Sequence, residues 1–314
     1  MGMPVDPRPI LLALRALKLG DLLVAVPALQ ALRRGFPDHR IVLATTEWLR
    51  PLVDLVDAVD ELLPAAGLDH LLDLGGREVD VAVNLHGRGP ESGRLLTAVS
   101  PRRLIAHAPD APDGPVWVDG MLERERWVRL VRAWGLDADA DDVTIARPAV
   151  PSAAPGVSVL HVGAFYGARR WPVDRFAEVA VGLERRGHDV VISAGGEERE
   201  RAEAVARAAD LPEDAVLAGR VDLAGFAALI ADARLVISAD TGAAHLASAY
   251  RRPSVVIFGP APPEEWGPPK NGPHVVLTDA SRRVGEVFVE DPDPALLAVQ
   301  ADDVLDAVER LLAH

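Results

Sequence analysis

Apolar residues along the chain alternate between short runs and longer stretches with helical spacing. Residues 10–14 form an apolar run, after which Leu22, Val26 and Leu29 recur at helical intervals. The alternation continues through the whole chain. It predicts strands at 10–14, 41–44, 79–85, 104–106, 157–162, 189–193, around 216, 235–238 and 254–258, and helices at 22–36, 47–56, 92–99, 121–134, 173–186, 197–209, 222–232, 242–250 and 301–312.

Residues 137–156 interrupt this pattern. The stretch is acidic at first and then rich in Pro, Ala and Ser, which is typical of an interdomain linker. We therefore predict an N-terminal domain at 1–136, a linker, and a C-terminal domain at 157–314. Strands alternating with helices in both halves predict two α/β domains with mainly parallel sheets. Ligands of such sheets bind beyond the carboxyl ends of the strands.

Composition and charge narrow the classes of function. A chain of 314 residues suits two domains of about 150 residues each. The net charge of −14 argues against nucleic acid or an anionic membrane surface as a partner. The lack of Cys excludes disulfides and thiolate chemistry. No apolar run reaches the roughly 18 residues of a membrane span, and the apolar stretch at 9–17 is too interrupted for a signal peptide, so we expect a cytoplasmic protein.

Two polar stretches that follow strands are candidates for binding. Gly20 permits a tight turn, and Asp21 is placed either to cap a helix or to accept a proton from a substrate hydroxyl. Arg169 and Arg170 precede a helix after the strand at 157–162, where guanidinium groups suit a phosphate or form a solvated surface pair. Each stretch by itself is compatible with a purely structural role.

Two further stretches lie after strands in the second half. Glu197 or Glu198 follows a glycine pair, where a carboxylate either favours the helix dipole or binds the hydroxyls of a ribose. Asp240, Thr241 and Gly242 separate a strand from a helix, and they either cap that helix or help its free N–H groups to hold a diphosphate. Asp240 would order the loop or accept a hydrogen bond from a donor hydroxyl. His245 is one turn further along and is by itself more typical of a structural residue.

Several alternatives are weakened by what the sequence lacks. Asp137 and Asp139 imitate an Asp-x-Asp metal motif but lie in the predicted linker, so we predict no metal site. Neither G-x-G-x-x-G after the first strand nor G-x-x-x-x-G-K-[ST] occurs, which disfavours a dehydrogenase and a P-loop protein.

Taken together in their order, these stretches resemble the heptosyltransferases of glycosyltransferase family 9. The resemblance covers most of the chain and is carried by four stretches: LRALKLGDLLVAVPALQALRRGFP, RRWPVDRFAEVAVGL, ISAGGEERERAEAVA and VISADTGAAHLASAYRRPSVVIFGP. It implies the GT-B architecture, with two facing Rossmann-like domains and a C-terminal helix that crosses back to the N-terminal domain. It also implies an inverting, metal-independent transfer of a sugar to an acceptor hydroxyl, without a cofactor.

The resemblance assigns roles to individual residues. Asp21 would be the general base, and Arg169 would replace the family's usual Lys, with Arg170 beside it. The ribose-binding acid would be Glu197 or Glu198. The donor's diphosphate would lie at Asp240, Thr241 and Gly242, accompanied by His245. On the acceptor side we expect Gly20, Asn84, His86 and Arg88, with His86 as a second candidate for the base.

The sequence departs from the family at one loop. Many relatives carry small hydroxyl residues that contact the phosphates, where this chain has Gly163, Ala164, Phe165 and Tyr166. The typical donor of the family is heptose on ADP, but other nucleotides and sugars stay open, as does the choice between a glycan and a small-molecule acceptor. A nucleotide-sugar epimerase on the same architecture and a non-catalytic nucleotide-sugar-binding protein are the alternatives. The Arg-rich, Lys-poor composition is typical of a GC-rich bacterial genome.

Overall fold

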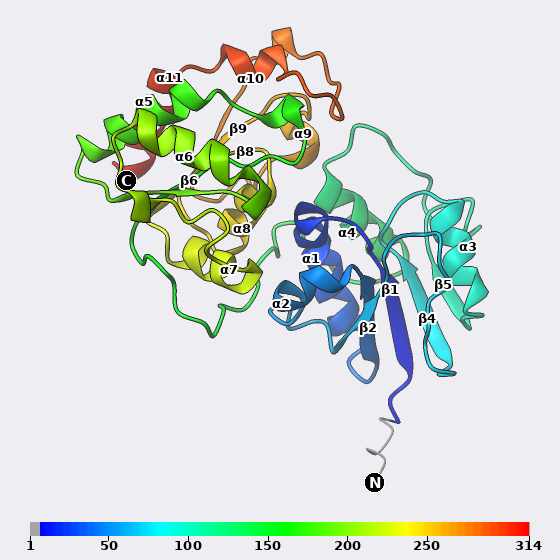
Figure 1. Ribbon diagram of the computed structural model, residues 1–314. Helices are drawn as coiled ribbons and strands as arrows, with labels where there is room; N and C mark the ends of the chain where they lie inside the picture. The colour runs from blue at the N-terminus through cyan, green and yellow to red at the C-terminus, as the bar shows by residue number, and fades with distance from the viewer. Residues whose placement is uncertain (1–6, 314) are drawn as a thin grey trace. The chain divides into compact units, whose positions relative to one another are not determined.

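The computed structural model describes residues 7–313, which divide into two compact units between Ala146 and Arg147. This division falls within the predicted linker, and residues 1–6 and 314, at the ends of the predicted domains, lie outside the described residues. Each unit contains a five-stranded, all-parallel sheet with helices packed against it (Figure 1). The predicted α/β class with parallel sheets is confirmed.

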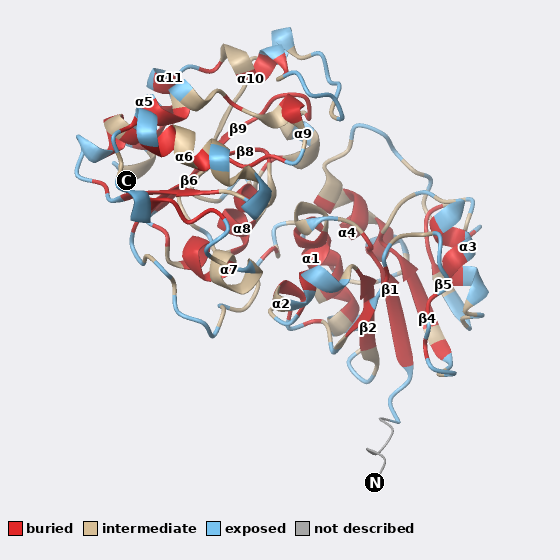
Figure 2. Cartoon of the chain, in the orientation of Figure 1, coloured by how far each residue is buried: buried red, intermediate tan, exposed pale blue. Residues whose placement is uncertain are grey.

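The first sheet has the strand order β3-β2-β1-β4-β5. Central strand β1 places Leu12 beside Val42 of β2 and Ala82 of β4. All of β1 is buried (Figure 2), as expected for a parallel strand covered on both faces. The elements of this unit are β1 (Ile10–Leu14), α1 (Leu19–Gly35), β2 (Arg40–Thr45), η1 (Glu47–Leu49), α2 (Arg50–Val53), β3 (Glu61–Pro64), β4 (Val79–Asn84), α3 (Glu91–Ala98), β5 (Arg103–Ile105) and α4 (Glu123–Ala133).

The second sheet has the order β10-β9-β8-β6-β7. Its elements are β6 (Ser158–His161), η2 (Gly167–Arg169), α5 (Val173–Glu184), β7 (Val190–Ser193), η3 (Gly196–Glu198), α6 (Arg199–Ala208), η4 (Glu213–Ala215), α7 (Leu223–Asp232), β8 (Leu235–Ala239), α8 (Gly242–Ala249), β9 (Ser254–Ile257), α9 (Pro263–Trp266), β10 (His274–Leu277), η5 (Ala280–Arg282), α10 (Pro294–Ala298) and α11 (Ala301–Leu312).

Strand β9 shows how this second sheet is covered on both faces. Val255 and Ile257 belong to the large core that includes residues of α5, α6 and α11, whereas Val256 packs with Ala244 of α8. Successive side chains of a strand point to opposite faces, so α5, α6 and α11 cover one face and α8 covers the other (Figure 1). The continuous apolar runs of these strands follow from this double burial.

The C-terminal helix differs from the expectation that it crosses back to the first domain. The buried side chains of α11 join the core of the second unit, where Leu305 packs over Gly182 of α5. A Cβ at Gly182 would lie 2.5 Å from Leu305 Cδ1, so the absence of a side chain there makes room for the helix. Arg186 also pairs with Glu309, with Nη2 2.6 Å from Oε1. The apolar face of α11 is therefore used within its own unit.

The sequence pattern did not predict the edge strands β3 and β10 or the short helices α9 and α10. Both β3 and β10 have four residues and lie at sheet edges, and β3 ends at Pro64. The strand predicted around residue 216 is a single bridge between Ile192 and Val216. The helix predicted at 121–134 ends as expected, with Gly135 at φ +84° and the Leu136 N–H donating to Val131 O. Within residues 7–313, no helix combines the length and apolarity needed to cross a membrane.

Candidate active site

In the first unit, Asp21 follows the central strand β1. This is the switch point of the sheet, because β2 lies on one side of β1 and β4 lies on the other. Helix α1 begins at Leu19, so Asp21 is the third helical residue and not the N-cap, and Gly20 lies inside the first turn instead of forming a separate one. The Asp21 carboxylate accepts the Lys18 N–H at 3.2 Å and is about one quarter exposed. A carboxylate in the first turn also interacts favourably with the helix dipole.

Arg15 is the main partner of Asp21, and sequence analysis did not single it out. Its side chain is 1% exposed. Its Nε donates to Asp21 O at 2.8 Å and its Nη2 lies 3.2 Å from Asp21 Oδ1, while Nη1 donates to Leu85 O at 2.6 Å. Nη2 also lies 3.3 Å from Glu123 Oε1 on α4. A charged residue directly after a buried strand was the available signal for Arg15.

The loop after β4 is organised by Asn84. Its side-chain oxygen accepts the N–H groups of His86 and Gly87 at 3.1 and 3.4 Å, and its amide nitrogen donates to Ser92 Oγ at 2.9 Å. Asn84 is buried, so it shapes the loop from within. Arg88, in contrast, is 64% exposed and lies 3.9 Å from an Asp119 carboxylate oxygen.

His86 lies against the loop after β1. Its Nδ1 accepts the Ala16 N–H at 3.2 Å. Burial, together with the charge of Arg15, lowers the pKa of His86 to about 4, and Asp21 opposes this shift. The neutral ring therefore carries its proton on Nε2. A nitrogen that already carries a proton cannot accept one, so Nε2 of the neutral ring can donate a hydrogen bond but cannot take up a proton.

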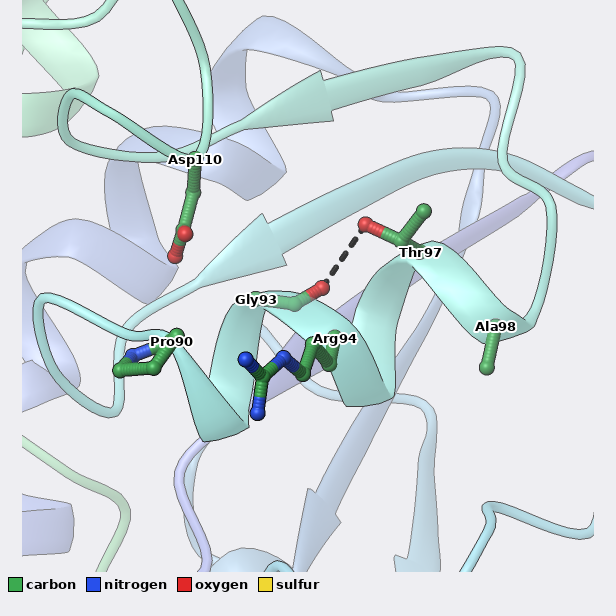
Figure 3. A pocket seen from close by; sticks show the side chains of 6 residues that line it. All are labelled: Pro90, Gly93, Arg94, Thr97, Ala98 and Asp110. Carbon is green, nitrogen blue, oxygen red and sulfur yellow. Dashed lines mark hydrogen bonds between the residues drawn. The ribbon is translucent and has the colours of Figure 1, made fainter.

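A pocket of about 490 Å³ borders this loop at α3 (Figure 3). Asp110 contributes to its lining, and burial raises the pKa of that carboxyl. Asn84 Nδ2 lies 3.4 Å from Asp110 Oδ2 and so connects the pocket to the loop after β4. The lining residues are Pro90, Gly93, Arg94, Thr97, Ala98 and Asp110.

The second unit brings the loops after β6 and β8 together at its own switch point. Arg169 Nη1 donates to Asp240 O at 3.4 Å, and Nη2 lies 3.5 Å from Asp240 Oδ2. His245 Nε2 lies 3.8 Å from Asp240 Oδ1. Asp240 is nearly completely buried. Its carboxylate therefore connects the β6 loop, the β8 loop and helix α8.

At this junction, Thr241 Oγ1 and Arg169 Nε are buried without a hydrogen-bond partner among residues 7–313. Thr241 is the N-cap of α8, yet its hydroxyl does not cap the helix. Gly242 is the first helical residue, and the first N–H groups of a helix have no partner within it. These donors, with the helix dipole and Arg169, are suited to an anion.

Arg170 and Arg169 diverge although they are adjacent. Arg170 Nε donates to Ala164 O at 3.3 Å and lies 3.9 Å from Glu198 Oε1, and its Nη1 lies 3.5 Å from Glu290 Oε2. Arg169, in contrast, points to Asp240 of the β8 loop. The position of the pair is fixed by Trp171, which is fully buried and donates to Val299 O at 3.1 Å.

Glu197 and Glu198 both lie in η3, before α6 begins. Glu198 accepts the Ala164 N–H at 2.8 Å, whereas Glu197 is exposed. A Cβ at Gly163 would lie 2.5 Å from Glu198 Oε2, so glycine permits this close approach. Glu198 is thus the carboxylate that borders the β6 loop.

The altered part of the β6 loop carries an exposed aromatic group. Phe165 contacts Tyr166 edge-on, with ring centroids 4.9 Å apart, and Tyr166 contacts Phe288 at 5.0 Å. Phe165 and Phe288 are 73% and 77% exposed. Phe288 lies far away in sequence, so no local pattern could have predicted this group.

Comparison with known proteins agrees with the geometry. Residues 131–285 match glycosyltransferase family 9 (heptosyltransferase). Lipooligosaccharide heptosyltransferase 2 of Haemophilus ducreyi is 31% identical over 352 aligned positions, covering 94% of this chain and 97% of that protein.

Two solved structures show the same fold. The E. coli ADP-heptose lipopolysaccharide heptosyltransferase II has a TM-score of 0.75 at 21% identity, covering 96% of this chain and 98% of that one. A family 9 glycosyltransferase from Veillonella parvula has a TM-score of 0.79 at 19% identity, covering 99% of both chains. The fold likeness supports the GT-B architecture, and the sequence matches favour transfer over the epimerase and non-catalytic alternatives. The chain belongs to glycosyltransferase family 9 and is a glycosyltransferase of the heptosyltransferase type.

Proposed function

We propose that the protein transfers a heptose or related sugar from an ADP-linked donor to a hydroxyl of a glycan or small-molecule acceptor, with inversion at the anomeric carbon. The observation that carries this proposal is the junction of Arg169, Thr241 and the start of α8, where the Thr241 hydroxyl and Arg169 Nε are buried without a hydrogen-bond partner in the described chain. A diphosphate supplies oxygens for such donors. ADP is chosen because the E. coli relative is described as an ADP-heptose enzyme.

The donor residues have separate roles in this proposal. Arg169, the Thr241 hydroxyl and the Gly242 N–H bind the diphosphate, and Asp240 holds Arg169 and His245 in place. Arg170 adds positive charge from the β6 loop. Glu198 binds the ribose hydroxyls, because its carboxylate borders that loop while Glu197 faces solvent.

Asp21 is the general base for the acceptor. It takes the proton of the acceptor hydroxyl as that oxygen attacks the anomeric carbon from the face opposite the diphosphate. The bond from the anomeric carbon to the phosphate oxygen breaks, and its electron pair leaves with ADP. Arg169, Arg170 and the α8 amides stabilise the charge that develops on the leaving group, a role that metal ions fill in other enzymes. Gly20, His86 and Arg88 border the acceptor, with His86 donating through Nε2.

Calorimetric titration with ADP, GDP, UDP and dTDP tests the donor site, and Thr241→Trp is the variant that should block it. We expect that ADP is the one diphosphate that binds to the parent protein, and that it does not bind to the variant. Binding of none of the four diphosphates by a well-folded parent protein would contradict the proposal.

ADP release from ADP-heptose tests the role of Asp21 as the base, when it is measured for the parent protein and for the Asp21→Asn variant. Unchanged release in that variant would exclude Asp21.

A further inference from the structure

Arg15 joins two carboxylates that lie on different elements of the first unit. Its buried guanidinium lies 3.2 Å from Asp21 Oδ1 and 3.3 Å from Glu123 Oε1 through the same nitrogen, Nη2. It also stacks on Trp127, with Cζ 4.8 Å from the ring centroid. One buried positive charge is therefore shared by two negative ones.

Glu123 is held firmly on α4. It accepts Arg126 Nε at 2.8 Å and Trp127 Nε1 at 3.1 Å, so its orientation does not depend on Arg15 alone. Its side chain is only 13% exposed. Truncating a buried partner of such a network leaves charge uncompensated, whereas an isosteric amide keeps the shape and removes the charge.

We infer that Arg15 and Glu123 are positioning residues that set the orientation and the charge environment of Asp21. Arg15 fixes the residue through the Asp21 carbonyl and one carboxylate oxygen, while the Lys18 N–H holds the other oxygen. Glu123 binds the same Arg15 nitrogen as Asp21, so Asp21 does not hold the positive charge alone. This inference rests on the proposed role of Asp21 as the base.

The charge balance around Asp21 gives opposite predictions for two variants. The groups that face its carboxylate are Arg15 from the β1 loop, His86 from the β4 loop and, through Arg15, Glu123 from α4. Arg15→Met removes the positive neighbour and should raise the pH at which the Asp21 carboxyl titrates. Glu123→Gln leaves Arg15 to Asp21 alone and should lower that pH. A merely structural role would not produce shifts of opposite sign.

The experiment uses the full chain in two measurements. The titration is followed by NMR of protein labelled with ¹³C at the Asp carboxyl groups, with Asp21→Asn identifying the resonance. Turnover is followed as ADP release from ADP-heptose with water as acceptor. Water then gives its proton to Asp21 and its oxygen to the sugar. We expect Arg15→Met to lower kcat about 10- to 100-fold with KM for the donor within about twofold, and Arg15→Lys to restore part of kcat.

Arg124→Met is the matched control. Arg124 is a buried arginine next to Glu123 on α4, but it pairs with Asp141 at 3.5 Å and has no part in the proposed site. Its loss should lower thermal stability while leaving kcat and the Asp21 titration unchanged. If Arg15→Met does not fold, Glu123→Gln still tests the inference, because it preserves shape.

The outcomes separate this inference from the proposed function. Shifts of opposite sign with reduced kcat would support it. Shifts of the same sign, no shift, or an equal loss of kcat in Arg124→Met would overturn it. Asp21→Asn could abolish ADP release while Arg15→Met and Glu123→Gln behave like the parent protein. Asp21 would then remain the proposed base, and only the positioning role of Arg15 and Glu123 would be contradicted. Should Asp21→Asn release ADP normally, the base assignment itself fails.

Discussion

Arg169 reaches from the loop after β6 to Asp240 after β8, with its Nη2 3.5 Å from Oδ2 and its Nη1 3.4 Å from the Asp240 carbonyl oxygen. The two loops are about 70 residues apart in sequence but meet because β6 and β8 are neighbours in the sheet. The contact holds the guanidinium beside the N-terminus of α8, where the proposed diphosphate would bind.

Replacing Arg169 should weaken ADP binding. Charge-assisted hydrogen bonds contribute about 1.5–3 kcal/mol, so we expect Arg169→Met to reduce affinity about 10- to 100-fold in calorimetric titration. Arg169→Lys should retain part of the affinity, since a point charge remains without the planar fork. Arg199→Met is the control, because Arg199 pairs with Glu203 on α6 and should leave ADP affinity unchanged. Equal affinities in all variants would remove Arg169 from the donor site.

Thr241→Val separates binding from stability. The Thr241 hydroxyl is buried without a partner in the described chain, which costs free energy in the ligand-free protein. Val keeps the shape, so the thermal midpoint of the free protein should stay equal or rise, while ADP binding weakens by about 1 kcal/mol or more. Thermal unfolding with and without ADP measures both effects. A lower midpoint with unchanged ADP binding would show that the hydroxyl serves the fold.

Stability should fall in acid through buried histidines. Burial lowers the pKa of His86, His107 and His161 to about 4, below the ordinary value of 6.5. Between these values the unfolded chain binds protons that the folded chain does not, so stability decreases as pH falls from about 6.5 to about 4. Both ring nitrogens of the buried His107 lack a hydrogen-bond partner among the described residues. His107→Phe should therefore make stability depend less on pH. Thermal unfolding from pH 4 to pH 8 measures it, and an unchanged slope would contradict the assignment.

Removal of divalent metal should leave transfer unchanged. Arg169, Arg170 and the start of α8 are proposed to stabilise the leaving diphosphate. ADP release after treatment with EDTA should therefore equal that of untreated protein, and added Mg²⁺ should not raise it. A loss in EDTA that Mg²⁺ restores would assign part of the charge stabilisation to a metal ion.

The sequence by itself determined the elements and the loops where chemistry could occur. Buried parallel strands appear as short apolar runs and amphipathic helices repeat their apolar positions every three to four residues, so both are visible locally. Strand β1, helix α11 and the loop at Asp240 were identified in this way. The edge strands β3 and β10 were not, because only two apolar residues lie between Glu61 and Pro64 in β3 and because no residue of β10 is fully buried.

Only the tertiary structure decided which of these residues meet. The order of strands in each sheet brings Arg169 to Asp240 and Arg15 to Leu85, and no local pattern contains that order. The pairing of Arg15 with Glu123, 108 positions away, depends on how α4 packs beside α1. The tertiary structure also places Glu198, and not Glu197, beside the β6 loop, because the backbone direction in η3 determines which carboxylate faces inward. Periodicity predicts burial of a segment, whereas contacts between distant polar groups arise from packing of the whole domain.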